Sequence, residues 1–378
     1  MKPFIYNLDL VKKQSDKALF NVISTFAGGG GSSTGYRLAG GKILAINEFI
    51  PEAQRVYGIN YPETHIFRED IRELNGEYIL NTLNLKKGEL DVLDGSPPCS
   101  SFSVSGLREE GWGRVKKYSD SKQRTDDLFF EFARLLNEIQ PKVFICENVK
   151  GITIGEASKL LGSQNQQQLD NSEKTIYNAL TDCGYNLKYK VLNAKEFGVP
   201  QARERTIFIG VRKDINREIT FPVGRTNIVT LQEAFENLIH TEEELNQTHT
   251  ETHEVFKKLT KIKEGGEWVM SFLYKAHRNK CARTLTASAG NIGGRCEHHW
   301  DNRKFTVKEA IRICSFPDDY YLGETYSNQI ERLGRAVPPL LMKAVIELVC
   351  KTILFPERKE FDFIETNISE YNDNLFDF

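Results

Sequence analysis

The chain has 378 residues, of which 40% are hydrophobic and 27% charged, and its formal net charge is −2. A chain of this length favours one large unit plus a smaller one. No apolar run is long enough to span a bilayer and no signal peptide follows Met1, so we expect a cytoplasmic protein. The net charge argues against a protein that coats nucleic acid indiscriminately, but it is compatible with a local basic face.

The first half of the chain alternates apolar, strand-like runs with amphipathic stretches. A helix is expected over residues 127–140, where apolar side chains recur at helical spacing until Pro141. This alternation predicts an α/β fold with a Rossmann-like, doubly wound, mostly parallel sheet. The expected strands are residues 21–26, 42–47, 64–67, 90–93 and 143–146.

The pattern of apolar residues changes in the second half of the chain. Residues 186–192 and 206–211 alternate like an antiparallel pair appended to the parallel sheet. From residue 217 to 304 the pattern is weak and polar, and helical periodicity then returns in residues 307–313 and 339–349. We therefore expect one domain from residues 1–216 and 305–378 and a second from residues 217–304. The Gln-rich stretch 162–169 and the acidic tail after Pro356 are expected at the surface.

Polar and glycine-rich groups follow the first three expected strands. Gly28 and Gly30 belong to a glycine turn after the first strand, where backbone can approach a ligand closely. Glu48 ends the second strand at the spacing where nucleoside-binding folds keep an acid for ribose hydroxyls, and Asp70 follows the third. Each acid could instead be a helix cap or a solvated turn residue.

Reactive side chains follow the next strands. Cys99 comes after two prolines that end the fourth strand, and Glu147 follows the strand 143–146, so both belong to the ligand-binding edge of the sheet. With a period of two, Arg203 and Arg205 share one face near a later strand. The alternatives are a free thiol in a turn, a structural ion pair for Glu147 and solvated edge arginines. The seven cysteines lack a CxxC pair, which favours separate thiols in a reducing compartment.

Five segments, taken in order, resemble the motif set of DNA cytosine-5 methyltransferases of the bacterial restriction-modification type. The resemblance covers nearly the whole chain except its first twenty residues, the region 217–281 and the tail. The segments are Phe26-Ala27-Gly28 with its glycine turn, Pro97-Pro98-Cys99, Glu147-Asn148-Val149, Gln201-x-Arg203-x-Arg205 and Leu333-Gly334-Arg335-Ala336-Val337-Pro338-Pro339.

The resemblance implies a mechanism. Cys99 would add to C6 of a flipped-out cytosine, Glu147 would be the acid near ring N3, and Arg205 would hold the cytosine O2. Arg203 would orient Glu147 or the base. The resemblance also implies S-adenosylmethionine as the cofactor. Its binding residues would be Phe26, Gly28, Gly30, Glu48, Asp70, Ile71, Pro98, Leu128 and Arg335.

The second domain resembles the target recognition region of the same family. Residues 257–283 contain eight basic residues against two acidic ones, which favours contact with DNA phosphates. The glycine-containing, locally basic loop 103–124 would close over duplex DNA. The expected DNA contacts are Ser103, Lys275, Arg278 and Arg283. The protein would act as a monomer, with a cognate restriction endonuclease acting separately.

Two positions depart from the family pattern. Ser100 replaces the usual glutamine and Arg335 replaces an asparagine, so Arg335 either pairs with the cofactor carboxylate or turns outward. The rival functions are a transfer-RNA cytosine-5 methyltransferase and a catalytically weak DNA-binding relative. A zinc site at Cys296, His298, His299 and Cys314 is not expected, because a second ligand pair is missing.

Overall fold

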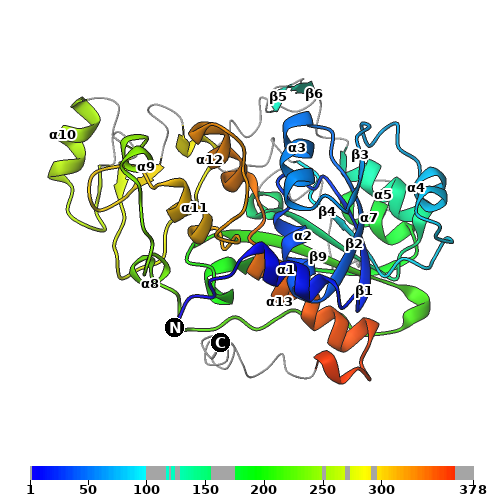
Figure 1. The fold of residues 1–378 in the computed structure, drawn as a ribbon. Coiled ribbons are helices and arrows are strands. Elements are labelled where there is room, and N and C mark those ends of the chain that lie inside the picture. Colours follow the sequence, from blue (N-terminus) through cyan, green and yellow to red (C-terminus); the bar gives the residue numbers. More distant parts are fainter. Residues whose placement is uncertain are drawn as a thin grey trace.

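Seven strands form the central sheet of the molecule, as the computed structural model shows (Figure 1). The structure describes residues 2–98, 116–118, 121–123, 128–154, 175–248, 253–268, 273–290 and 296–361. In spatial order the strands are β3 (His65–Phe67), β2 (Gly41–Asn47), β1 (Phe20–Thr25), β4 (Val92–Gly95), β7 (Val143–Val149), β9 (Glu204–Arg212) and β8 (Tyr185–Asn193).

The sheet is mostly parallel, as the sequence predicts. β1 pairs in parallel with β2 and β4, β2 with β3, and β4 with β7, whereas β9 is antiparallel to both β7 and β8. The chain builds the sheet outward from β1 in one direction and then resumes at β4 on the other side. This reversal makes the carboxyl ends of β1 and β4 the switch point where open α/β sheets bind ligands.

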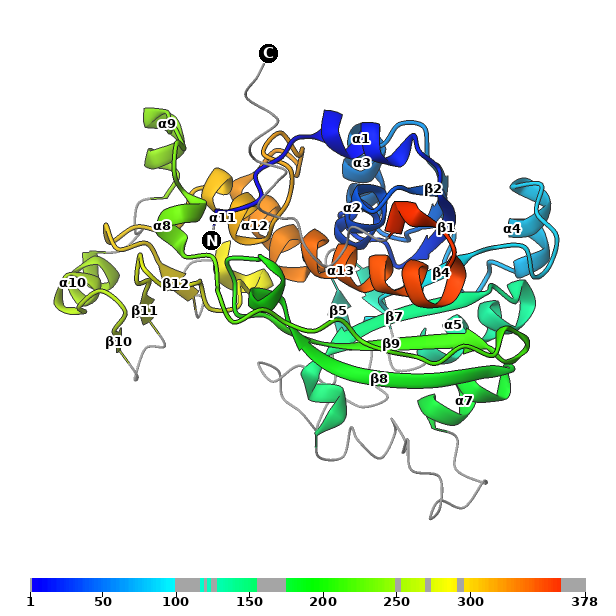
Figure 2. The same cartoon turned by 90° about the horizontal axis from the view of Figure 1, so that it is seen from below.

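Helices cover both faces of the sheet (Figure 2). Val22 and Val92 face one apolar core and their neighbours Ile23 and Leu93 face another, which is the alternation expected of strands buried on both sides. The first core is covered by α1 (Leu8–Ser15), α2 (Gly31–Leu38) and α13 (Pro339–Val349). The second is covered by α4 (Gly76–Thr82), α5 (Leu128–Ile139) and α7 (Ile176–Asp182).

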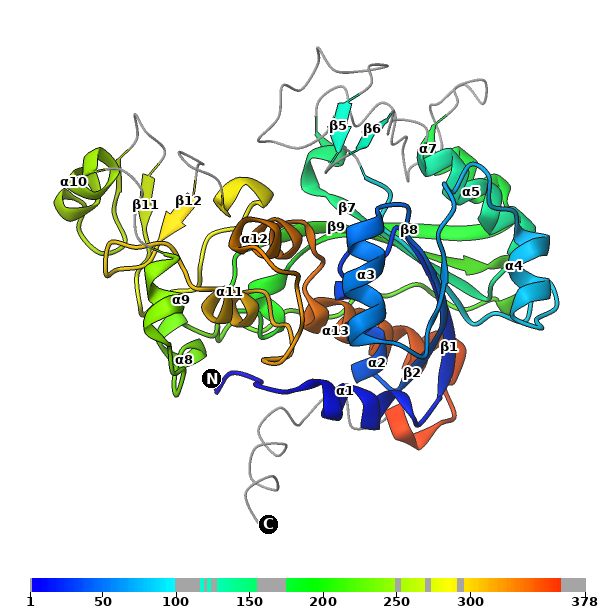
Figure 3. The same cartoon turned by 45° about the horizontal axis from the view of Figure 1, so that its top comes forward.

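The segment between β9 and α11 (Val307–Ile313) forms a smaller lobe (Figure 3). Its three-stranded sheet has the order β10 (Glu267–Trp268), β11 (Leu273–Lys275) and β12 (Cys296–His298). Leu231 and Leu285 belong to the core of the large unit, so the boundaries at residues 217 and 304 stay a prediction. The lobe also contains α8 (Leu231–Ala234), α9 (Glu242–Asn246), α10 (His253–Lys261) and the 3₁₀ turn η5 (Ala287–Gly290).

Two further helices and a hairpin belong to the parts of the sequence outside the small lobe. α3 (Pro51–Asn60) follows β2, and α12 (Tyr326–Arg335) connects α11 with α13. A short hairpin is formed by β5 (Lys116–Tyr118) and β6 (Ser121–Gln123). None of the described helices is long and apolar enough to cross a membrane.

The sequence misplaces some strand ends. β7 continues to Val149, so Glu147 lies within this strand, whereas the sequence predicts that it follows the strand. β4 begins at Val92 and not at Leu90, because the Asp91 N–H donates to the Asn21 side chain at 2.8 Å before regular pairing starts. The helices expected at residues 307–313 and 339–349 are confirmed. Three of the expected features lie outside the described residues: Cys99 with most of the loop 103–124, the stretch 162–169, and the tail beyond residue 361.

Candidate active site

The glycine turn between β1 and α2 has a backbone that few residues other than glycine adopt. Gly28 and Gly30 have φ of 53° and 87°, and even Phe26 has a φ of 54°. A Cβ on Gly28 would meet nothing within 4 Å, so this side of the turn is open. A Cβ on Gly30 would lie 2.5 Å from Tyr320 Oη, and that hydroxyl donates to the Gly29 carbonyl at 2.6 Å. The turn is therefore open at Gly28, and Tyr320 packs against it at Gly30.

Glu48 lies beside this turn, as the sequence predicts. Its carboxylate accepts hydrogen bonds from the N–H groups of Gly28 and Ile50, both at 2.7 Å. Burial raises its pKa, against the effect of these hydrogen bonds. Each oxygen keeps a second acceptor position, so Glu48 fits a ligand hydroxyl. The next residue, Phe49, is an aromatic side chain with 41% exposure and suits stacking on a planar base, a role that the sequence did not reveal.

The other expected cofactor residues occupy more enclosed positions. The Asp70 carboxylate pairs with Arg72 at 2.9 Å, and Ile71 is buried with its carbonyl accepting from Arg134. Leu128 is buried at the start of α5, while Pro98 is half-buried. A ligand that binds the Asp70 carboxylate would therefore compete with Arg72.

The backbone that leads to Cys99 is fixed at three points. The Thr25 hydroxyl donates to the Asp94 carbonyl at 3.0 Å, and the Asn148 amide donates to the Pro97 carbonyl at 3.0 Å. A Cβ on Gly95 would lie 2.6 Å from the Phe132 ring, so the strand end packs closely. Cys99 itself lies outside the described residues, but the strand that carries it ends between β1 and β7.

Glu147 and Arg205 form a buried ion pair at the same sheet edge. Arg205 Nε lies 2.6 Å from Glu147 Oε1, and the two side chains are 12% and 10% exposed. Burial lowers the pKa of Arg205, while the neighbouring Glu147 acts in the opposite direction. Glu204 points away and pairs with Lys150 at 3.0 Å, as strand alternation requires. The pair offers one carboxyl and one guanidinium beside the end of β4.

Arg203 has a different partner from the one that the sequence suggests. Its guanidinium donates to the carbonyls of Leu285 at 3.0 Å and Gly334 at 2.8 Å, whereas the ion pair of Glu147 is with Arg205. The physical reason is that Arg203 precedes β9 and points into a junction where it is 1% exposed. Burial and the adjacent Arg205 lower its pKa to about 9. We therefore describe Arg203 as a positioning residue.

Gln201 reinforces the same junction. Its carbonyl oxygen accepts from the Leu285 N–H at 3.2 Å and its amide donates to the Ile313 carbonyl at 3.3 Å. Arg203 and Gln201 therefore join four parts of the chain: the segment before β9, residues 282–286 of the small lobe, the end of α11 and the end of α12.

Arg335, the departure from the family pattern, is the last residue of α12. Its guanidinium pairs with Glu331 at 2.8 Å and its side chain is 33% exposed. Within α12, Arg335 is therefore held by an ion pair one turn away, while its neighbour Gly334 is held by Arg203.

The three basic residues predicted to contact DNA differ in exposure. Lys275 is only 8% exposed, which does not suit a phosphate contact. The Arg278 and Arg283 side chains are 47% and 54% exposed, and each pairs with one carboxylate, Glu264 and Glu267 respectively. Ser103 lies outside the described residues.

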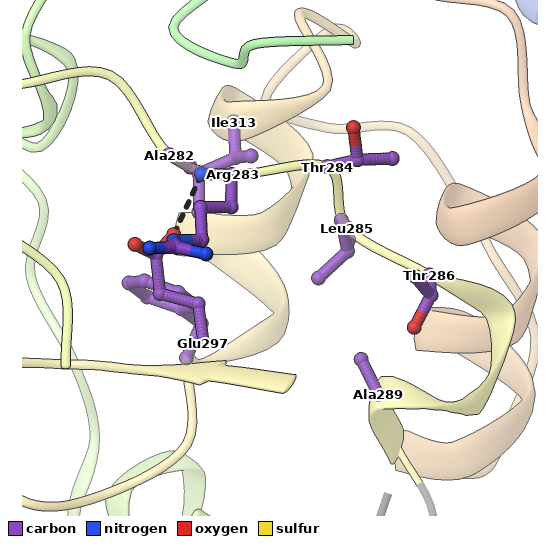
Figure 4. Close-up of a pocket in the computed structure, with 9 residues that line it drawn as sticks. Ala282, Arg283, Thr284, Leu285, Thr286, Ala289, Glu297 and Ile313 are labelled. Atoms are coloured by element: carbon purple, nitrogen blue, oxygen red, sulfur yellow. Dashed lines mark hydrogen bonds between the residues drawn. The ribbon is translucent and has the colours of Figure 1, made fainter. Parts of the chain in front are cut away.

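The Arg278 guanidinium lies 5.3 Å from the centroid of the Trp300 ring, and Arg283 lies closer to a ring of its own. Its guanidinium lies over the Tyr274 ring at 3.9 Å from the centroid. The Glu297 carboxylate accepts from its backbone N–H at 2.8 Å (Figure 4). These contacts lie beside residues 284–286, which line a pocket with Ala289 and Ile313 (Figure 4). Arg283 is thus a preoriented guanidinium next to the Arg203 junction.

No group of three or more potential metal ligands occurs in the described parts of the chain. His299, considered above for zinc, packs against Trp300 and Phe235 and lies 3.6 Å from Glu309. Its contacts are those of a buried structural side chain.

The chain is similar to known proteins over most of its length. Residues 20–351 match the family described as C-5 cytosine-specific DNA methylase. The chain is 32% identical over 355 residues to Type II methyltransferase M1.HphI of Haemophilus parahaemolyticus, covering 87% of this chain and 86% of the relative. It is 30% identical over 354 residues to Type II methyltransferase M.Eco47II of Escherichia coli, covering 86% and 78%.

Solved structures show the same fold. One is a crystal structure of a putative DNA modification methyltransferase encoded within a prophage of E. coli, with a TM-score of 0.68, 22% identity and coverage of 86% of this chain and 97% of that one. Another is a mutant of Spodoptera frugiperda DNMT2, with a TM-score of 0.61, 18% identity and coverage of 86% and 97%. On the family match and the two Type II relatives, the chain belongs to the C-5 cytosine-specific DNA methylases.

Proposed function

We propose that the chain transfers a methyl group from S-adenosylmethionine to C5 of a flipped-out cytosine in a specific duplex DNA sequence. The observation that carries this proposal is the Glu147–Arg205 pair, at 2.6 Å, beside the end of the strand that leads to Cys99. A base must leave the duplex for a thiol to reach C6. The sheet edge where β4, β7 and β9 lie side by side would receive the extruded base.

In this mechanism the Cys99 thiolate adds to C6, and the electron pair moves through the ring while Glu147, which must first take up a proton, protonates N3. Arg205 holds the cytosine O2 and keeps Glu147 in place. The bound cofactor supplies an electrophilic methyl group on a sulfonium. After C5 has gained the methyl group, a base removes the C5 proton, the Cys99–C6 bond breaks to restore the thiolate, and N3 returns its proton to Glu147.

The cofactor would lie over the glycine turn. The open space at Gly28, the acceptor capacity of Glu48 and the exposed ring of Phe49 fit a nucleoside with a flexible tail. We expect Phe26, Gly30 and Pro98 to line the same site, and Ile71 and Leu128 to support it.

Residues 217–304 would act as the target recognition domain, with Arg278 and Arg283 facing DNA. We further propose that the protein acts as a monomer on double-stranded DNA. The Type II names of its relatives favour a restriction endonuclease that cuts the same sequence.

The proposal is tested by incubating the wild type and Cys99→Ser with labelled S-adenosylmethionine and either duplex DNA or transfer RNA. We expect label in 5-methylcytosine of DNA with the wild type only. Label in transfer RNA but not in DNA would favour the rival substrate. No label in either would favour a catalytically weak relative.

A further inference from the structure

Asp94 is a carboxyl group buried in the central sheet that the proposed mechanism does not use. It is 1% exposed and lies in β4, in register with Ser24 of β1. The Ser24 hydroxyl donates to Asp94 Oδ2 at 2.5 Å and the Tyr36 hydroxyl to Asp94 Oδ1 at 2.8 Å. Val92, on the same face of β4, belongs to the apolar core. A charged carboxyl group in such an apolar layer lowers the free energy of unfolding, which suggests that Asp94 has a function.

The charged group that acts on Asp94 is another acid. Tyr36 of α2 donates to Asp94 directly, and burial, followed by Asp94 itself, Cys146 and Cys350, raises the pKa of Tyr36. Burial, and to a smaller extent the charge of Glu147 in β7, raises the pKa of Asp94 to about 7, although the hydrogen bonds from the two hydroxyls act in the opposite direction. No cation of the described segments contributes to this balance. By contrast Asp91, at the other end of the same strand segment, pairs with Lys142 at 2.7 Å.

The position of Asp94 relates this acid to the ligand site. The Asp94 carboxylate links β1, which leads to the glycine turn, with β4, which leads to Cys99. Tyr36 links it to α2, which starts at Gly31 directly after the turn. Asp94 is one residue before the end of β4, so its charge lies just beneath the switch point between β1 and β4.

We propose that the Asp94 carboxylate makes this site select a cationic ligand, so that sulfonium S-adenosylmethionine binds more tightly than its neutral thioether product, S-adenosylhomocysteine. The inference rests on the proposed function, because it assumes this cofactor. The two ligands share every other charged group, so the difference in affinity reports the sulfonium charge. A positive charge bound nearby stabilises the ionised carboxylate, so binding near neutral pH releases a proton from Asp94 to the buffer.

The test is isothermal titration calorimetry of both ligands with the wild type, Asp94→Asn and Asp91→Asn between pH 6 and 8.5. Buffers with different ionisation enthalpies measure proton release. For the wild type we expect the preference for the sulfonium to rise with pH through about 7. Loss of the charge in Asp94→Asn should reduce that preference on the order of tenfold, make it independent of pH and abolish the proton release. Asp91→Asn is the matched control, since its carboxylate already has a cation, and should behave as the wild type.

Circular dichroism of each variant checks that it folds. Equal preference in the wild type and Asp94→Asn, or equal proton release, would overturn the inference and leave the proposed function intact. A wild type that binds neither ligand would overturn the proposed function and this inference with it.

Discussion

A charged Asp94 should make the stability of the protein depend on pH. Its pKa is about 7 in the folded state against 3.8 for the free side chain, so the folded state holds the proton more firmly. Stability should therefore fall as pH rises from about 4 to 7. Asp94→Asn removes this dependence. Above pH 7 the free energy of unfolding of the variant should therefore exceed that of the wild type by a few kcal/mol. Urea unfolding at several pH values measures this, and parallel curves for the two proteins would contradict the assignment.

Tyr320 should affect the cofactor turn through one hydroxyl group. Tyr320→Phe removes the donor to the Gly29 carbonyl and leaves the ring in the core. We expect S-adenosylmethionine to bind several-fold more weakly, with about 1 kcal/mol lost from the free energy of unfolding. Tyr321→Phe is the control, because its hydroxyl bonds Glu324 at the surface. Equal cofactor affinity in the two variants would show that Tyr320 does not position the turn.

The contact between α12 and the turn η5 tests the junction at the level of elements. A Cβ on Gly334 would lie 2.4 Å from Ala287 N and from the Thr286 carbonyl carbon, which are backbone atoms that cannot move cheaply. Gly334→Ala should therefore lower the free energy of unfolding by roughly 2 kcal/mol and reduce methyl transfer. In Gly58→Ala, inside α3, the new Cβ has only an ordinary contact with Ile66, so stability should be unchanged or slightly higher. Chemical denaturation compares the two variants.

The sequence predicts elements better than it predicts contacts between them. The strands follow from local apolar patterns, and the position of Glu48 follows because it comes directly after a strand, whereas Glu147 lies within β7. The partner of Arg203 could not be predicted, because Leu285 and Gly334 are 82 and 131 residues away along the chain. Asp94 follows the expected strand 90–93 directly, but only the fold reveals that the hydroxyls of Ser24 and Tyr36 donate to it. Phe49 is visible in the sequence, yet its exposure depends on the packing of α3.

Across the whole molecule, the small lobe should determine which DNA sequence is methylated. Arg283 has a fixed orientation over Tyr274, which suits hydrogen bonding to a guanine edge. Arg283→Ala should relax the choice of base at one position, by about 1–3 kcal/mol, with smaller effects elsewhere. Arg278→Ala, which removes a guanidinium bound to Glu264, should weaken methylation evenly across sites. Sequencing of methylated cytosines in random DNA distinguishes these two outcomes. An equal loss of methylation at all sites in Arg283→Ala would indicate that Arg283 contacts a phosphate and not a base.

At the scale of the whole molecule, we propose that the sheet edge beside Glu147 and Arg205 delivers a cysteine to C6 of a DNA cytosine. The most direct measurement is covalent trapping on duplex DNA that contains 5-fluorocytosine in the target sequence, with S-adenosylmethionine present. Because fluorine cannot leave as a proton, the Cys99 adduct should persist, and the wild type should give a denaturation-resistant complex whose cross-linked peptide contains Cys99. The absence of that complex in the wild type, or its presence in Cys99→Ser, would contradict the account.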